Sequence, residues 1–230
     1  SKDMSNDKII IYQLLPRLYG NRNTTRKENG SISDNGCGKF NDLTASVLKS
    51  IWQKGATHVW FTGVIRHATK TDYSAHGIPV NHPAIVKGNA GSPYAITDYY
   101  DVDPDLAEDV NRRMAEFEAL VERAHKSRLG VIIDFVPNHV ARQYVSVCKP
   151  KGVRDLGADD NQSQGFNPQN NFYYCPGCSF EPYLDLYAGT AEPYHEEPAK
   201  ATGNDHFDHK PGQNDWYENV KINYGVDYYA

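Results

Sequence analysis

The chain of 230 residues carries a formal net charge of −5, and 39% of its residues are hydrophobic. This composition predicts a folded core and argues against a nucleic-acid-binding surface, which would be basic. Every apolar run is shorter than the about 20 residues that a membrane helix needs, so we expect neither a nucleic acid nor a membrane as partner.

The N-terminus, residues 1–8, is polar, and we expect it to be disordered. It has no apolar segment of the kind that marks a signal peptide. A signal peptide that had been removed would leave no trace in the sequence, so the cellular compartment stays open.

Three short apolar runs predict β-strands at residues 9–15, 58–62 and 131–136. A first helix is expected to begin with Asp42 as its N-cap and to end at Gly55, which suits a residue just past a helix. Its predicted apolar face consists of Leu43, Val47, Leu48, Ile51 and Trp52. A second helix is expected over residues 106–129, where the buried stripe comprises Val110, Met114, Phe117, Leu120, Val121 and Ala124.

The order strand–helix–strand–helix–strand over residues 9–139 is typical of a parallel sheet in an α/β protein. Right-handed crossovers then lead either to a closed barrel or to a sheet covered on both faces. Neither a G-x-G-x-x-G nor a G-x-x-x-x-G-K motif follows a predicted strand, which disfavours a nucleotide-binding protein.

Two long segments lack regular periodicity. Residues 63–105 are predicted to form a long loop, and a loop of that length in a compact domain is usually functional. Residues 140–222 are polar but rich in Phe and Tyr, so we expect an ordered, irregular subdomain inserted after the third strand rather than a disordered segment. Residues 223–230 are interpreted as a return to the main body.

The four cysteines are Cys37, Cys148, Cys175 and Cys178. The last two form a C-x-x-C motif, which is compatible with zinc binding or redox chemistry. A structural zinc site needs two further ligands at a similar spacing, and the sequence has no second C-x-x-C or H-x-x-x-H. We therefore favour thiols or one local disulfide over zinc.

Polar residues interrupt and follow the third predicted strand. Asp134 lies inside the apolar run, where a buried carboxylate needs a partner. Asn138 and His139 come directly after Pro137, at the carboxyl end of the strand. Because β/α folds build their sites at the carboxyl ends of strands, this end is the predicted location of a functional site.

Five segments in chain order resemble the α-amylase family of glycoside hydrolases. They are Ile11–Tyr19, Gly38–Leu43, Gly55–Thr62, Ser92–Asp103 and Asp134–His139, the last being similar to the Asp-x-Val-x-Asn-His motif of that family. The resemblance implies a TIM (β/α)8 barrel in which an irregular domain B, here residues 140–222, is inserted after strand 3.

Such a barrel typically needs about 250 residues before insertions. The resemblance therefore implies that the chain is the N-terminal portion of the barrel, truncated before strand 4, with residues 9–139 as the first three β/α units. The nucleophile and the acid/base residue of the family would follow later strands. We expect no catalytic residue in this chain, and no activity without the remainder of the barrel as its partner.

The resemblance also implies roles for single residues. Tyr94 would stack on the sugar and His139 would hydrogen-bond it. Asp134 would be buried in its strand and would support the site through an arginine that lies outside this sequence. Asp98 would order its loop by accepting hydrogen bonds from backbone amides.

Asn138 is a calcium ligand in many relatives, so a bound calcium ion is an alternative to a site without any cofactor. Aligning residues 220–223 with the segment that supplies a second ligand in the family places Lys221 at the position of an acidic ligand. We expect Lys221 to replace the ion and to bind Asn138 or nearby carbonyl groups.

The function implied is a retaining glycosidase that acts on α-glucosidic bonds of starch-like sugars, with an α-glucan or maltooligosaccharide as substrate. The alternatives are a transglycosidase of the same family, a non-catalytic scaffold or binding relative, and an unrelated carbohydrate-binding β/α domain. The substrate class favours a periplasmic or extracellular location.

Overall fold

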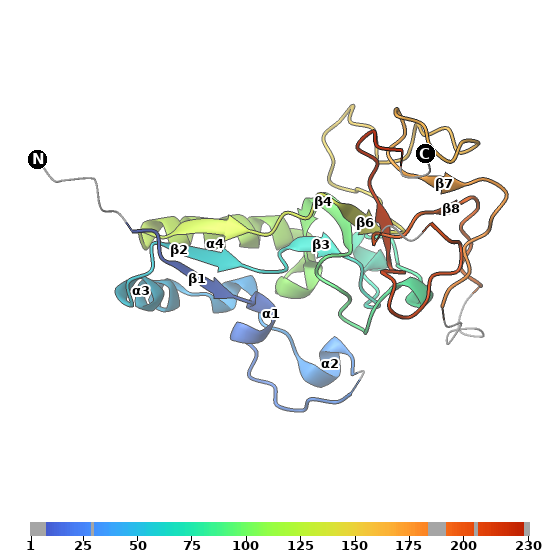
Figure 1. The fold of residues 1–230 in the computed structure, drawn as a ribbon. Helices are drawn as coiled ribbons and strands as arrows, with labels where there is room; N and C mark the ends of the chain where they lie inside the picture. The colour runs from blue at the N-terminus through green and yellow to red at the C-terminus, as the bar shows by residue number, and fades with distance from the viewer. Residues whose placement is uncertain (1–7, 29, 184–191, 205–206, 228–230) are drawn as a thin grey trace, which may run out of the picture. The chain divides into compact units, whose positions relative to one another are not determined.

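The computed structural model describes residues 8–28, 30–183, 192–204 and 207–227 (Figure 1). The chain divides into two compact units, one made of residues 1–64 and 102–135 and the other of residues 65–101 and 136–230. The predicted disordered N-terminus lies outside the described residues except for Lys8.

The first unit is built on a parallel sheet of three strands. The strands are β1 (Ile11–Leu14), β2 (His58–Phe61) and β5 (Gly130–Ile133), in the order β1-β2-β5. Both pairs are parallel, with Leu14 opposite Phe61 and Phe61 opposite Ile133. The three predicted strands and their parallel arrangement are confirmed. Each strand is shorter than predicted, and β5 ends before Asp134.

Two helices complete the β/α pattern of this unit, α3 (Ala45–Gln53) and α4 (Arg113–Lys126). Buried apolar side chains from both helices and from the sheet form one core, including Leu48, Phe61 and Leu120. Gly55 follows α3 with a φ of 99°, as a residue just past a helix requires. Short helical turns fill the loops of the unit: α1 (Pro16–Tyr19), α2 (Ile32–Asn35), η2 (Phe40–Asp42), η5 (Pro104–Leu106) and η6 (Val110–Arg112).

Three helix predictions were wrong in detail. Thr44, not Asp42, caps α3, because its side chain accepts a hydrogen bond from the Val47 amide. Trp52 is 37% exposed instead of buried, and the guanidinium of Arg128 covers its ring at 5.1 Å. The second helix begins at residue 113 rather than 106, because the turns η5 and η6 occupy the intervening segment.

Within its described residues, the second unit contains three two-stranded sheets joined by long loops. The pairs are β3 (Ile65–His67) with β4 (Ile96–Val102, all but its last residue in this unit), β6 (His139–Ala141) with β9 (Asn219–Lys221), and β7 (Tyr174–Cys175) with β8 (Ala199–Lys200). Two short turns, η3 (Ser74–His76) and η4 (Pro83–Ile85), lie between β3 and β4. The segment 63–105, predicted to be a loop, therefore contains a pair of strands.

A buried ion pair holds the irregular part of this unit together. Arg142, directly after β6, donates from Nη1 to Glu196 Oε2 at 2.6 Å and from Nε to the Tyr217 carbonyl at 2.6 Å. The guanidinium carbon lies 3.8 Å from the centre of the Phe180 ring. Arg142 thus connects segments up to 75 residues apart, which explains how a sequence without periodicity forms an ordered unit.

The second unit also includes residues 65–101 and 223–227. Asn223, in the segment interpreted as a return to the main body, donates from its amide to the Asn171 carbonyl at 2.7 Å within this unit. The division into domains at residues 139 and 222 stays a prediction.

Candidate functional site

A pocket of about 460 Å³ lies in the second unit. It is lined by Lys87, Ser92, Tyr94, His139, Trp216, Glu218 and Asn219. The pocket brings together Tyr94 and His139, the two residues for which the sequence predicts contact with substrate. The other lining residues were not singled out in the sequence.

His139 is the first residue of β6, and its side chain is buried. Its ring centroid lies 5.2 Å from that of Trp216. Gly203 packs against the other side, since a Cβ atom at that position would lie 3.1 Å from the Cβ of His139. The histidine ring is therefore fixed in place by contacts from two distant segments.

Burial lowers the pKa of His139 below its ordinary value of 6.5. A hydrogen bond to the Tyr94 backbone acts in the opposite direction with a smaller effect, and the positive charge of Lys221 lowers the pKa further. Together these effects favour the neutral form of the imidazole. Its buried Nδ1 atom has no hydrogen-bond partner among the described residues.

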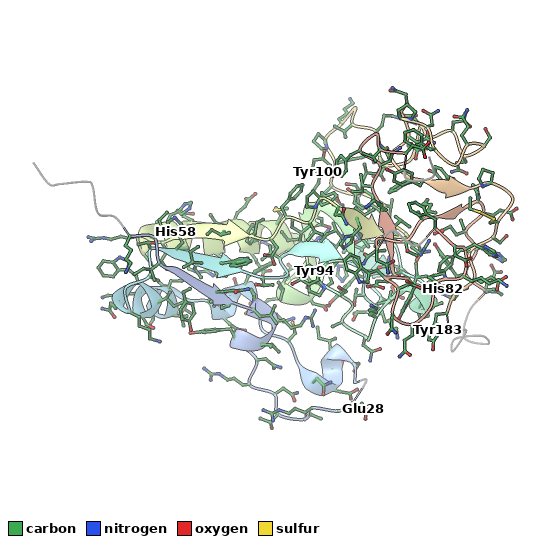
Figure 2. The ribbon with its side chains drawn as sticks, viewed as in Figure 1. Glu28, His58, His82, Tyr94, Tyr100 and Tyr183 are labelled. Atoms are coloured by element: carbon green, nitrogen blue, oxygen red, sulfur yellow. A yellow bond between two sulfur atoms is a disulfide. The ribbon has the colours of Figure 1, made fainter. Side chains whose placement is uncertain are left out.

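Tyr94 supplies an aromatic surface on the turn that precedes β4 (Figure 2). The turn is closed by hydrogen bonds from the Tyr94 amide to Ser92 Oγ and from the Ala95 amide to the Ser92 carbonyl. The side chain of Tyr94 is 50% exposed, and that of Trp216 is 41% exposed. Two accessible aromatic rings in one pocket suit a ligand with flat apolar faces.

Glu218 and Asn219 supply buried polar groups to the same pocket. Glu218 Oε1 lies 3.4 Å from Lys87 Nζ and accepts a hydrogen bond from Asn219 Nδ2 at 3.3 Å. Sequence reasoning missed these residues because the motif alignment began at Val220. The run of aromatic and polar residues before that strand, Trp216 to Asn219, was a signal that could have indicated them.

Asp98 orders the segment after β6 by accepting several hydrogen bonds. Ser146 Oγ donates to its Oδ1 at 2.7 Å, and the Val147 amide donates to its Oδ2 at 2.8 Å. Arg66 pairs with both Asp98 and Asp101 at 3.2 Å, and all three side chains are buried. Asp98 is not among the residues that line the pocket, and its contacts are those of a structural residue.

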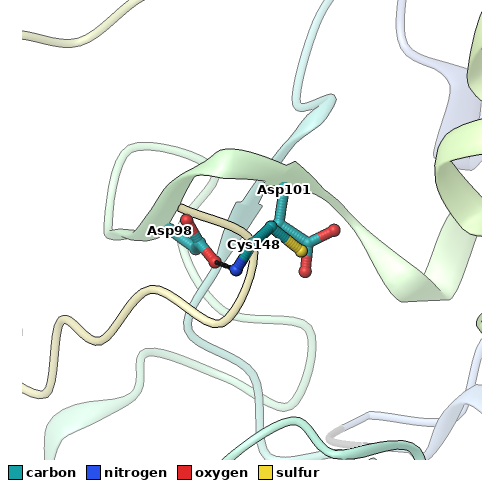
Figure 3. A group of neighbouring side chains, drawn as sticks. All are labelled: Asp98, Asp101 and Cys148. Atoms are coloured by element: carbon teal, nitrogen blue, oxygen red, sulfur yellow. Dashed lines mark hydrogen bonds between the residues drawn. The ribbon is translucent and has the colours of Figure 1, made fainter. Parts of the chain in front are cut away.

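Figure 3 shows Asp98 and Asp101 with Cys148, whose ligand atoms lie within 4.8 Å of one another. Within the described ranges this is the only such group of at least three His, Cys, Asp or Glu residues. The positively charged Arg66 guanidinium already pairs with both carboxylates and would repel a cation, so these residues do not fit a metal ion. Calcium binding by Asn138 stays a prediction, as does a site without any cofactor.

The remaining predicted residues lie near the pocket or in the first unit. Lys221 is buried and is the cross-strand partner of His139. Asn138 is exposed, and its carbonyl accepts a hydrogen bond from the Ile222 amide at 3.1 Å. The expected contact of Lys221 with Asn138 or nearby carbonyls stays a prediction. Asp134 was expected to be buried within its strand, but it follows β5 and is half-buried, and its Oδ1 accepts a hydrogen bond from Trp60 Nε1 at 2.6 Å.

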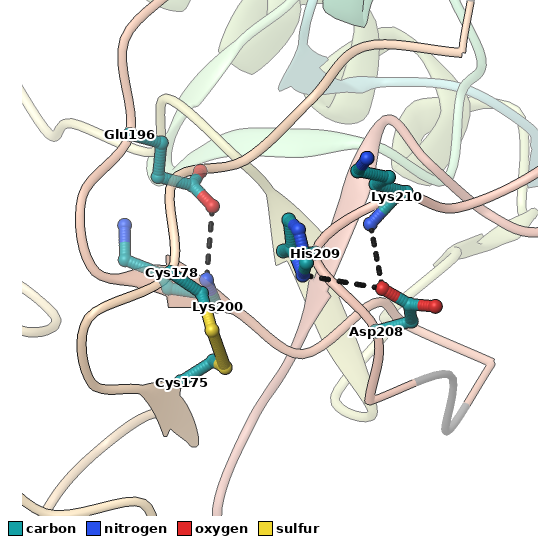
Figure 4. Close-up of a disulfide and its surroundings, with 7 residues drawn as sticks. All are labelled: Cys175, Cys178, Glu196, Lys200, Asp208, His209 and Lys210. Atoms are coloured by element: carbon teal, nitrogen blue, oxygen red, sulfur yellow. Dashed lines mark hydrogen bonds and ion pairs between the residues drawn. A yellow bond between two sulfur atoms is a disulfide. The ribbon is translucent and has the colours of Figure 1, made fainter.

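Cys175 and Cys178 form a local disulfide at the start of the loop between β7 and β8 (Figure 4). Nearby, the Lys200 amide donates to Glu196 Oε2 at 2.9 Å. Of the two outcomes favoured by the sequence, the local disulfide is the one observed, and it removes both sulfur atoms as zinc ligands. Cys37 and Cys148 are thiols outside any disulfide.

Comparison with known proteins gives a consistent set of relatives. The family model for the catalytic domain of alpha-amylase matches residues 15–176. Maltase 1 of Drosophila virilis is 24% identical over 196 residues, which cover 82% of this chain and 24% of the relative. Cyclomaltodextrin glucanotransferase of Geobacillus stearothermophilus is 22% identical over 176 residues, covering 72% of this chain and 22% of the relative. The chain spans less than a quarter of the length of either protein.

Among solved structures, an alpha-amylase from Lactobacillus plantarum is 27% identical, with a TM-score of 0.40 over 60% of this chain and 24% of that chain. In the part of the chain that the structure describes, no helix combines the length and the apolar character needed to cross a membrane.

Proposed function

The chain belongs to the alpha-amylase family, and from this premise we propose that it is part of a glycoside hydrolase that acts on α-glucosidic bonds of starch-like sugars. The pocket of the second unit would bind one glucosyl unit of an α-glucan or maltooligosaccharide. In this proposal Tyr94 and His139 contact the sugar.

The observation that carries the proposal is that Tyr94, Trp216 and His139 line one pocket, where the buried Nδ1 atom of His139 has no hydrogen-bond partner in the described part of the chain. A pyranose ring has an apolar face that can pack on an aromatic ring and hydroxyl groups that can bind polar atoms at the pocket wall. Neutral His139 can accept a hydrogen bond from a hydroxyl group at Nδ1. The pocket therefore offers both kinds of contact that a sugar needs.

The proposed reaction is retaining and proceeds through a covalent glycosyl intermediate. It requires two carboxyl groups about 5 Å apart on either side of the scissile bond. Among the residues that line the pocket, Glu218 is the only one with a carboxylate. We therefore assign neither the nucleophile nor the acid/base to a residue of this chain. We propose that the chain contributes to binding the sugar.

Four further residues are proposed to support the site. Asp98 would order the loop after β6, and Asp134 would fix the end of β5 through Trp60. Lys221 and Asn138 would stabilise the strand pair that carries His139. We also propose that the irregular segment of the second unit is the domain inserted after the third strand of the barrel.

A transglycosidase remains the alternative within the same family, since one relative is a glucanotransferase. The two reactions share the glucosyl intermediate and differ in whether water or a sugar hydroxyl receives the glucosyl group. Product analysis with maltotriose, carried out on the whole enzyme to which the chain is proposed to belong, distinguishes them, because transfer yields oligosaccharides longer than the substrate.

The proposal is tested by measuring maltotriose binding to the protein by titration calorimetry. Tyr94→Ala and His139→Ala are each expected to weaken binding by about tenfold or more, which corresponds to ~1.4 kcal/mol. Tyr100→Ala is the matched control, since Tyr100 is similarly exposed but does not line the pocket (Figure 2). Absence of maltotriose binding, or equal losses in Tyr100→Ala and Tyr94→Ala, would contradict the proposal.

A further inference from the structure

We propose that Glu218 and Asn219 determine sugar selectivity by accepting hydrogen bonds from hydroxyl groups of the sugar that packs on Trp216. This inference rests on the proposed glucan-binding function and assigns the polar contacts that would select the ligand. Both residues lie outside residues 15–176, which the family model matches.

Glu218 lines the pocket, and only one of its two carboxylate oxygens has partners among the described residues. Oε1 contacts Lys87 Nζ at 3.4 Å and accepts from Asn219 Nδ2 at 3.3 Å. Oε2 is buried and has no hydrogen-bond partner among the described residues, although the residue is only 3% exposed. A buried carboxylate oxygen without a donor is costly, so a donor from a ligand would be strongly bound.

In the Asn219 side chain too, one polar atom has a hydrogen-bond partner and the other has none among the described residues. Its Nδ2 donates to Glu218, whereas its buried Oδ1 has no partner within the described part of the chain. The backbone is fixed in β9 and accepts a hydrogen bond from the Gly203 amide at 3.2 Å. The side chain is only 2% exposed. The position of the amide oxygen is thus fixed by the backbone of β9 and by the hydrogen bond of Nδ2, not by a donor to the oxygen itself.

The two unpartnered oxygen atoms define the chemistry of the ligand. Ionised carboxylate and amide oxygens only accept hydrogen bonds, so the ligand must donate. Lys87 already balances the charge of Glu218, which disfavours a metal cation as the occupant. A neutral polyhydroxylated ring supplies hydroxyl donors at its edge and an apolar face for Trp216, so a sugar satisfies both features of the pocket.

The variant Glu218→Gln tests the contact with little change in size. Lys87 Nζ and Asn219 Nδ2 are both donors, so they hold the amide oxygen of the new side chain and direct its NH₂ group to the position of Oε2. The acceptor becomes a donor and the negative charge is lost. We expect maltotriose affinity, measured by titration calorimetry, to fall by about tenfold.

Monodeoxy analogues of maltotriose identify the hydroxyl group concerned. One analogue lacks the hydroxyl group that Glu218 binds. This analogue should bind the original protein about tenfold more weakly than maltotriose does, whereas Glu218→Gln should bind the analogue and maltotriose with similar affinity. Likewise, Asn219→Ala should bind maltotriose and the analogue that lacks the hydroxyl group bound by Asn219 with similar affinity. Glu181→Gln is the matched control, because this carboxylate forms an exposed pair with Lys210 and does not line the pocket.

The outcomes separate this inference from the proposed function. Binding of maltotriose that is weakened by Tyr94→Ala but unchanged in Glu218→Gln and Asn219→Ala would overturn the inference and leave the proposed function intact. Equal losses for every deoxy analogue in the original protein and in both variants would also overturn it. A protein that does not bind maltotriose at all would refute the proposed function itself. Thermal unfolding of each variant verifies that it is folded.

Discussion

His139 and Lys221 are cross-strand partners in the antiparallel pair of β6 and β9, and both side chains are buried. A lysine at this position places a positive charge beside the imidazole. Together with burial, which has the larger effect, this charge lowers the pKa of His139 below 6.5. The strand register therefore adds a charge that, with burial, favours the neutral form of the histidine.

The first prediction concerns the titration of His139. We expect its midpoint, followed by NMR of the ring protons, to lie below pH 6.5 and to rise in Lys221→Met, where the neighbouring charge is removed. The folded state binds the proton more weakly than the unfolded state does. The stability gained from neutral His139 is therefore complete above pH 6.5 and is lost as the pH falls from 6.5 through the lower, folded-state pKa.

Lys210→Met is the control for this titration, because Lys210 is exposed and is not among the charges that act on His139. It should leave the midpoint unchanged. A midpoint above 6.5 in the original protein would show that the imidazole is stabilised in its charged form, contrary to the geometry described.

The second prediction concerns Gly203, which packs against the pocket wall. A Cβ atom there would lie 3.0 Å from the Asn219 Cβ and 3.1 Å from the His139 Cβ. Gly203→Ala should displace both residues and weaken maltotriose binding by about three- to tenfold, as measured by calorimetry. Gly212→Ala is the control, since its nearest neighbouring atom would be at an ordinary 3.5 Å. Equal affinities of both variants and the original protein would refute this packing argument.

The third prediction concerns the buried pair of Arg142 and Glu196. Arg142→Met leaves the Glu196 carboxylate buried without its cation and should lower the free energy of unfolding by about 3–5 kcal/mol in urea titrations. Adding Glu196→Gln should recover part of this loss, because the uncompensated charge is removed.

The exposed pair of Arg154 and Asp159 provides the comparison, with an Nη2–Oδ1 distance of 2.8 Å. Arg154→Met should leave the unfolding midpoint unchanged, since solvent screens this pair. Similar effects of the two arginine substitutions would mean that the Arg142 pair does not stabilise the second unit.

The fourth prediction concerns the hydrogen bond from Trp60 Nε1 to Asp134 Oδ1 in the first unit. Trp60→Phe removes the donor and should lower the free energy of unfolding by about 1–2 kcal/mol, because Asp134 is only half-buried and water replaces part of the bond. Trp52→Phe, at an exposed ring under Arg128, should have a smaller effect. The opposite order of the two losses in urea titrations would contradict a supporting role for this bond.

Local sequence patterns predicted the first unit well. Short apolar runs that end near glycine or proline indicated all three strands of the parallel sheet, because runs of this length are typical of strands that are buried on both faces. Element ends were less well predicted. Asp42 and Thr44 are both suitable N-cap residues, and only the backbone shows which of them accepts the hydrogen bond from the first turn.

The candidate site was predicted only where a short motif contained it. Tyr94 and His139 lie in segments that resemble a known family, whereas Trp216, Glu218 and Asn219 lie in a segment without periodicity. Asp134 was predicted to be buried in its strand, yet the strand ends one residue earlier and its partner is a tryptophan 74 residues away. Contacts between residues so far apart along the chain leave no periodic signal in the sequence.

The sequence by itself determined the parallel strands, their helices, and the polar residues at the end of the third strand, because these depend on local propensity, on short apolar runs and on the helical spacing of apolar residues. Only the tertiary structure decided which residues form the pocket. The antiparallel register of β6 and β9 brings residues about 80 positions apart beside one another, so that His139 meets Lys221 and the pocket gains Glu218 and Asn219. That register depends on buried contacts such as the Arg142 ion pair, which form only when the whole unit has folded.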